Sequence, residues 1–284
     1  MTRSKATAVG FVAVLLWALL ALLTVGSAPT PPLLLNAICF TIGGTLGLIW
    51  TMRTGGLGQL RKIPWKVYAF GSVGLFGYHA LYFSALRLAP AAEAGLIAYL
   101  WPLLIVLFSG LLPGERLRPG HLIGAILGFA GAAAIITGGS GGFQAEFLPG
   151  YILAFLCALT WSGYSVLSRL MGSAPTSSVA VFCVVTAIAS WGLHFALEET
   201  IWPQGTIGWA STLLLGLGPV GLAFYVWDIG VKQGDIQMLG TSSYAAPLLS
   251  TLVLVLAGVA DPSWALALAA ALITAGAAIA AKSG

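Results

Sequence analysis

The sequence predicts an all-α integral membrane protein, with ten transmembrane helices in two inverted five-helix repeats around a central cavity. Three observations lead to this fold class. Hydrophobic residues make up 59% of the 284 residues and charged residues only 7%, whereas roughly a quarter of the residues in soluble domains are charged. The apolar runs are long enough to cross a bilayer. The pattern of the first half of the chain returns in the second half, 144 or 145 residues later.

This composition excludes several classes of protein. No soluble core can bury so much apolar surface, so the lipid bilayer is the first predicted partner. The net charge of +4 is informative through its distribution over the loops and does not indicate nucleic acid. Cys39, Cys157 and Cys183 each lie within an apolar run, and no Cys/His cluster is present. We therefore predict neither a disulfide nor a metal or other cofactor.

Charge-free runs and turn residues divide the chain into ten candidate spans. The first apolar run, 6–25, is longer than the core of a signal peptide, so we interpret it as a span. The spans are expected at about 7–26, 32–52, 66–88, 91–112, 120–138, 149–171, 177–197, 206–231, 237–258 and 263–281. Prolines and glycines in short connections separate them, and these connections leave no room for a soluble domain.

The distribution of Lys and Arg predicts the orientation in a bacterial inner membrane. If the N-terminus is cytoplasmic, eleven of the twelve basic residues fall on the cytoplasmic side and only Arg87 falls outside. Basic residues concentrate on the cytoplasmic side of membrane proteins. An even number of spans returns the C-terminus, with Lys282, to the cytoplasm.

The two halves, 1–142 and 143–284, match as repeats joined by Gly138–Gly142. Trp17 corresponds to Trp161, Tyr99 to Tyr244 and Pro102 to Pro247. Each half holds five spans, an odd number, so the second half enters the membrane from the opposite face. In inverted repeats, substrates bind near the midplane between the halves.

Aromatic residues with polar edges, together with two prolines, gather near the predicted midplane. Lipid-facing Trp and Tyr prefer the interfaces, so this depth indicates either packing between helices or the wall of a cavity. The prolines either kink their helices for packing or free carbonyls toward a cavity. The candidate substrate-binding residues are Trp17, Tyr78, His79, Tyr82, Tyr99, Trp101, Pro102, Trp161, Tyr164, Tyr244 and Pro247.

Ionisable residues within the spans are few. His79 alone is both titratable and central, and it is either a packing residue or one that binds substrate or carries a proton. Asp228 and Lys232 are spaced for a local pair along one helix. Arg87 and Glu93 are expected to pair across the outer turn.

An enzyme is not predicted. The chain has no phosphate-binding loop and no zinc-protease motif. The alternative from a different class of protein is an intramembrane enzyme that uses Ser242 or His79.

Small residues line spans 5 and 10, including Gly124, Gly128 and Gly276. Such faces let helices approach closely. They predict either packing within one chain, which leaves a monomer, or a weak homodimer through these two spans.

Several motifs resemble the drug/metabolite transporter superfamily, in its EamA-like branch. They are Leu16-Trp17-Ala18, Ala89-Pro90 with Glu93-Ala94, Tyr99-Leu100-Trp101-Pro102, Gly114-Glu115-Arg116 and the glycine-rich fifth span. The resemblance covers essentially the whole chain. It implies export of amino acids and related metabolites across the inner membrane, through a central cavity, by alternating access.

The second half departs from the first at three of these positions. When the two halves are aligned, Met238 corresponds to Glu93, Ala246 to Trp101 and Ala260 to Glu115. We therefore expect the first half to bind the substrate and the second half mainly to gate.

The residues themselves favour a small-molecule substrate with a flat apolar side chain, such as an aromatic amino acid, and acceptance of other neutral amino acids. A nucleoside or a cationic drug is the alternative cargo. Both proton-coupled and facilitated export remain open.

Overall fold

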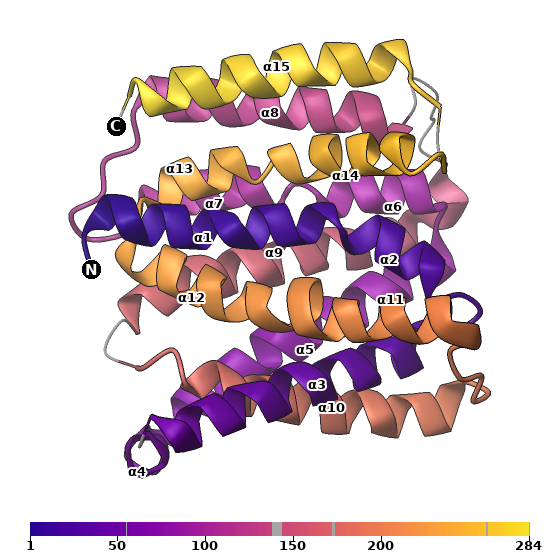
Figure 1. Ribbon diagram of the computed structural model, residues 1–284. Helices are drawn as coiled ribbons and strands as arrows, with labels where there is room; N and C mark the ends of the chain where they lie inside the picture. Colours follow the sequence, from indigo (N-terminus) through magenta and orange to yellow (C-terminus); the bar gives the residue numbers. More distant parts are fainter. Residues whose placement is uncertain (55, 138–143, 172–173, 260, 284) are drawn as a thin grey trace.

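The computed structural model describes residues 1–54, 56–137, 144–171, 174–259 and 261–283, and no strand occurs within these ranges. The long helices run alongside one another in one bundle, with both termini at the same end (Figure 1). The helices are α1 (Arg3–Ala18), α2 (Leu20–Gly26), α3 (Pro32–Arg53), α4 (Leu57–Leu60), α5 (Trp65–Leu88), α6 (Ala91–Ala98), α7 (Trp101–Ser109), α8 (Pro119–Thr137), α9 (Leu148–Leu170), α10 (Ser178–Leu197), α11 (Gly205–Leu217), α12 (Ala223–Gln233), α13 (Ile236–Ser242), α14 (Ala245–Leu256) and α15 (Trp264–Ala281), with a 3-10 turn η1 (Ala145–Phe147) and a π-helical segment η2 (Gly218–Leu222). The predicted joint at Gly138–Gly142 lies outside the described residues.

Within the described residues, eight helical segments are long and apolar enough to cross a membrane. The predicted class, an all-helical membrane protein, is therefore confirmed. Two of the expected spans are not among the eight. The 24-residue helix α5 is made less apolar by His79 and its tyrosines, and the fourth span is interrupted, so that it provides only the shorter apolar segment Glu93–Ser109.

Helix breaks occur near both prolines that the sequence singled out, Pro102 and Pro247, and near a third, Pro219. Helix α6 ends at Ala98, and Pro102 is the second residue of α7, where its missing N–H costs no hydrogen bond. Helix α13 ends at Ser242 before α14, which contains Pro247. Pro219 lies within the π-helical segment η2. A further break at Leu19, between α1 and α2, has no proline to mark it in the sequence.

The small faces of spans 5 and 10 pack against each other within the chain. The contact between α8 and α15 is the most extensive between any two described elements. A Cβ on Gly124 would lie 2.5 Å from the carbonyl oxygen of Gly276, and a Cβ on Gly128 would meet the ring of Tyr244. The glycine faces of these two helices therefore serve packing within one chain.

Candidate functional site

Four tryptophans meet in the centre of the bundle. Trp17 on α1, Trp101 on α7, Trp161 on α9 and Trp227 on α12 contact one another in all six pairwise combinations, with ring centroids 5.2 to 6.4 Å apart. Trp17 is half-buried, and the other three are buried. We call this group the tryptophan cluster. It joins helices from both halves of the chain.

The predicted tyrosines extend the tryptophan cluster. Tyr78 contacts Trp161 with 5.3 Å between the ring centroids, and Tyr82 stacks on Tyr78 with 3° between the ring planes. The ring centroid of Tyr99 lies 6.2 Å from that of Trp101. All three tyrosines are half-buried, although they belong to the same ring network as fully buried residues. The structure therefore brings the predicted aromatic residues together.

Tyr164 and Tyr244 belong to the same network but are buried. Tyr164 stacks on Trp161, with 5.3 Å between the ring centroids. Tyr244 has no accessible surface, and its hydroxyl accepts a hydrogen bond from the amide of Leu103 at 3.0 Å. Pro102 and Pro247 are also buried. In this conformation, these four residues support the walls around the more accessible tyrosines.

His79 lies at the edge of the tryptophan cluster. Its Nδ1 lies 2.7 Å from the carbonyl oxygen of Leu75, one turn earlier in α5. Its ring contacts those of Phe40 and Phe224. Its Nε2 has no hydrogen-bond partner among the described residues. When Nδ1 donates its proton to Leu75, Nε2 of the neutral ring is an acceptor.

Trp17 connects the tryptophan cluster to a distorted helix. Its indole Nε1 donates a hydrogen bond to the carbonyl oxygen of Pro219, at 3.1 Å. A π-helical turn leaves the regular hydrogen-bond pattern, and such turns are frequent at functional sites. The freed carbonyl is therefore satisfied by a side chain from the other half of the chain.

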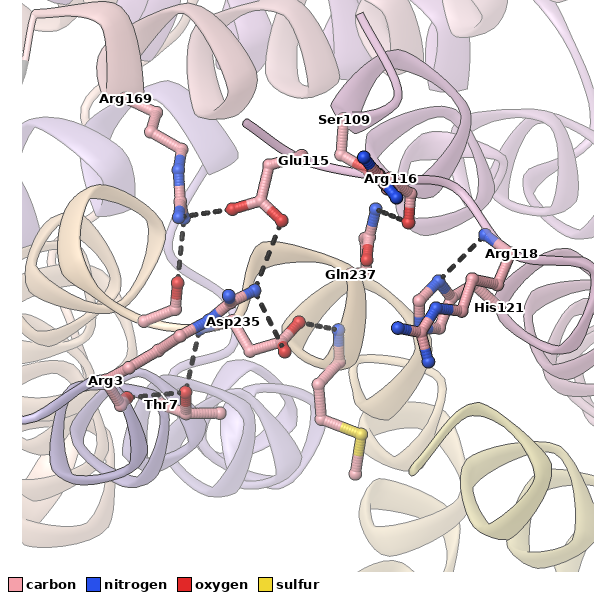
Figure 2. Close-up of polar contacts among 12 residues, drawn as sticks. Arg3, Thr7, Ser109, Glu115, Arg116, Arg118, His121, Arg169, Asp235 and Gln237 are labelled. Carbon is pink, nitrogen blue, oxygen red and sulfur yellow. Dashed lines mark hydrogen bonds and ion pairs between the residues drawn. The ribbon is translucent and has the colours of Figure 1, made fainter. Parts of the chain in front are cut away.

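A charged cluster joins four segments at the end of the bundle that carries the termini (Figure 2). Glu115, after α7, pairs with Nη2 of Arg169 at 2.5 Å and with Nη2 of Arg3 at 3.2 Å. Arg3 also pairs with Asp235 at 3.1 Å. Arg169 donates further hydrogen bonds to the carbonyls of Val231 and Gly234. The cluster thus connects the start of α1, the α7–α8 loop, the end of α9 and the α12–α13 turn.

Asp235 has two further roles in this charged cluster. Its carboxylate accepts a hydrogen bond from the amide of Met238 at 2.9 Å, and so caps α13. Its own amide donates to the hydroxyl of Thr7 on α1, at 2.8 Å. The start of α13 is thereby held against α1.

A smaller charged group lies at the opposite end and corrects one prediction. Arg87 pairs with Glu198 at 3.3 Å, and not with Glu93. Glu198 also accepts hydrogen bonds from the amides of Leu33 and Leu34, at the start of α3. Free amides and the helix dipole fix a carboxylate at this position, which gives Arg87 an ordered partner. His194, which the sequence did not mark, bonds to the same carboxylate at 3.0 Å.

Two other sequence hypotheses can be compared with the contacts. The local pair between Asp228 and Lys232 is confirmed, with 2.8 Å between the charged atoms, and the hydroxyl of Thr176 donates to the same carboxylate. No described histidine forms a hydrogen bond with Ser242. The described residues include no group of three or more His, Cys, Asp or Glu side chains that could hold a metal.

Sequence analysis missed Trp227 as a site residue. Its indole donates to the hydroxyl of Ser165 at 3.1 Å, which anchors it within the tryptophan cluster. The only sequence signal is its place opposite Tyr82 in the repeat.

Membrane-spanning helices that are interrupted beside a shared aromatic centre define a multi-pass membrane transporter. The model of the EamA-like transporter family matches the chain twice, over residues 4–137 and 148–281. The chain belongs to the EamA-like transporter family.

The comparisons also identify individual relatives. The aromatic amino acid exporter YddG of Ancylobacter novellus is 56% identical over 283 residues, which cover 99% of this chain and 98% of the relative. The exporter of the same name from Salmonella typhimurium is 28% identical and covers 88% of both chains. A crystal structure of a protein with 54% sequence identity matches with a TM-score of 0.94 over 98% of both chains.

Proposed function

We propose that this protein exports aromatic and other neutral amino acids across the bacterial inner membrane by alternating access. The observation that carries this proposal is the tryptophan cluster with its half-buried tyrosines, which contains no Lys, Arg, Asp or Glu side chain. Such a site accepts flat apolar side chains by stacking. The name of the relative from Ancylobacter novellus supports the same substrate class.

The transmembrane arrangement in this proposal is ten spans in two inverted repeats, 1–142 and 143–284. Helix α5 and the interrupted pair α6–α7 supply the two spans beyond the eight apolar segments. The pattern of helix packing supports the symmetry. Exchanging the halves converts the extensive α1–α12 contact into the α9–α5 contact, and leaves the α3–α10 and α8–α15 contacts unchanged.

In this arrangement the termini are cytoplasmic, and the charged cluster of Arg3, Glu115, Arg169 and Asp235 closes the cytoplasmic end. It links segments that belong to both halves. Among the described residues, the ion pairs at the opposite end also join the two halves, but they do so through α5, α3 and α10, and not through α1, α7, α9 and α12, which carry the tryptophan cluster. This asymmetry supports a conformation that is closed toward the cytoplasm. Alternating access requires that the charged cluster separate when the substrate enters.

Within the site, Trp101 and Trp161 hold the substrate ring, and His79 with Tyr82 and Tyr99 binds its amino or carboxyl group. Trp17, Tyr78, Tyr164, Tyr244, Pro102 and Pro247 shape the surroundings. His79 is also the candidate for proton coupling, because its Nε2 has no hydrogen-bond partner among the described residues. We propose that the protein is a monomer, since its small helix faces are used internally.

The test is efflux of labelled tryptophan from proteoliposomes, with and without a pH gradient. Trp101→Ala and His79→Ala are expected to lower the flux at least tenfold, which corresponds to about 1.4 kcal/mol in the free-energy barrier to transport. Trp264→Ala is the matched control, because Trp264 is 82% exposed at the start of α15. Normal flux in both site variants contradicts the site assignment.

The same assay separates the alternatives. Competition by unlabelled nucleosides or cationic compounds, but not by amino acids, would change the proposed cargo. Substrate-driven proton movement that disappears in His79→Ala would establish coupling. Its absence, with flux retained, indicates a facilitator.

A further inference from the structure

A groove of about 520 Å³ lies at the end of the bundle that carries the termini. One wall is formed by α4, the α4–α5 connection and the start of α5, and the other by Leu170 and Met171 at the end of α9 with Ala174 and Pro175 before α10. Most of its lining is apolar and includes Ile63, Val67, Leu170 and Met171. The polar lining consists of Gln59 and Lys62. The groove is separate from the tryptophan cluster, and none of the lining residues belongs to it.

The segment that contributes the wall with Lys62 is strongly basic. Arg53, Arg61, Lys62 and Lys66 lie in a stretch of fourteen residues, 53–66, that contains no acid. All four are exposed, and none forms an ion pair with a described residue. Lys62 lines the groove itself, and the positive charge of the stretch around it favours an anionic ligand.

A carboxylate behind the opposite wall, that of Asp228, does not offset this charge. Asp228 pairs with Lys232 at 2.8 Å, and the same ammonium group donates to the carbonyl of Ala174, which lines the groove. The acid is therefore neutralised by its own neighbour. The groove retains the positive potential of the 53–66 stretch.

The surroundings indicate that the groove opens at the boundary between membrane and water. Trp65 is 73% exposed and Leu170 is 58% exposed, at the ends of two long helices, α5 and α9. Exposed tryptophan at a helix end is typical of the membrane interface. Apolar walls that continue into exposed apolar helix faces suit an acyl chain, whereas a small water-soluble anion would gain nothing from them.

We propose that this groove binds an anionic phospholipid of the cytoplasmic leaflet. The phosphodiester contacts Lys62 and Gln59 at the rim, and one acyl chain follows the wall formed by Ile63, Val67, Leu170 and Met171. Basic pockets between transmembrane helices on the cytoplasmic side bind acidic headgroups by the same combination of charge and apolar contact. The inference rests on the position of the groove at the membrane surface and does not depend on which solute is transported.

Native mass spectrometry of the purified full chain in neutral detergent tests the headgroup contact. The probes are phosphatidylglycerol and phosphatidylcholine with identical acyl chains. Phosphatidylglycerol is expected to bind the wild type more tightly than phosphatidylcholine, and Lys62→Gln is expected to weaken its binding by roughly fivefold. Lys282→Gln removes an equal charge from the same end of the bundle, outside the groove, and is expected to leave binding unchanged.

The apolar wall is tested by Val67→Trp, which fills the groove, and by Met171→Gln, which is milder and preserves the fold if the larger residue does not. Both are expected to reduce phosphatidylglycerol binding while the basic residues remain. Three results would each overturn the proposal: equal binding of the two lipids, equal effects of Lys62→Gln and Lys282→Gln, or displacement of the lipid by inorganic phosphate, which would indicate a site for a free anion.

Discussion

The indole N–H of Trp17 donates a hydrogen bond to the carbonyl oxygen of Pro219, 202 residues away along the chain. Pro219 lies in the π-helical segment between α11 and α12, and Trp17 lies near the end of α1. The contact joins a distorted helix of the second half to an aromatic ring of the first. The same indole contacts the other three members of the tryptophan cluster. One side chain thus contributes to both the packing of the halves and the candidate site.

Replacing Trp17 with Phe should separate these two contributions. The variant retains an aromatic ring but loses the donor to Pro219, so a backbone carbonyl inside the bundle loses its partner. We expect a loss of about 1 kcal/mol in the free energy of unfolding, measured by thermal denaturation in detergent. Trp161→Phe is the matched control, because no described residue accepts a hydrogen bond from its indole. An equal loss of stability in both variants would show that ring size, and not the hydrogen bond, is decisive.

Replacing Tyr244 with Phe removes the acceptor of the Leu103 amide at the start of α7. This amide has no partner one turn earlier, since α6 has already ended at Ala98. We expect Tyr244→Phe to destabilise the protein by about 1 kcal/mol. Tyr99→Phe at the repeat-related position should not, because the hydroxyl of Tyr99 forms no hydrogen bond with a described residue. The measurement is the denaturation midpoint of each variant, which should fall for Tyr244→Phe and stay unchanged for Tyr99→Phe.

Substitution by alanine is expected to have opposite effects at Gly124 and Gly192, because their surroundings differ. A Cβ on Gly124 meets the backbone of α15, whereas a Cβ on Gly192 of α10 meets nothing within 4 Å. We expect Gly124→Ala to cost about 1–3 kcal/mol through overpacking. Gly192→Ala should be neutral, or should stabilise the helix by up to about 1 kcal/mol. Thermal denaturation measures both, and a stable Gly124→Ala variant would contradict the close α8–α15 packing.

Local signals in the sequence were enough to predict most of the fold. The apolar runs and the turn residues between them lie within a few residues of the observed helix ends, because the bilayer and proline each impose a strong local constraint. The break near Pro102 followed from the missing amide of that residue. The break at Leu19 could not be predicted, since no residue there departs from ordinary helix chemistry.

The misses in the site have a different origin. Trp227 lies four residues from the end of the span expected at 206–231. This position is away from the predicted midplane, where the candidate residues gather. The partner of Arg87 was missed because Glu198 is 111 residues away, and only the packing of α3, α5 and α10 brings the two together.

Glu115 provides the sharpest test of the proposed opening at the end of the bundle that carries the charged cluster. Its carboxylate, of which only 8% is exposed, holds two arginines from different segments. Glu115→Gln removes the charge but retains the size, so the pairs with Arg3 and Arg169 both weaken and closure becomes less favourable. The measurement is labelling of a cysteine by a membrane-impermeant maleimide, added on the side that we propose to be cytoplasmic. In a background without the three native cysteines, Val166→Cys places the thiol in α9 between Trp161 and Arg169, at a residue that is now buried. We expect labelling to be several-fold faster with Glu115→Gln.

Glu146→Gln is the control, because Glu146 is exposed in η1, outside the charged cluster. Unchanged labelling in Glu115→Gln, with the fold intact, would mean that packing and not charge closes this end.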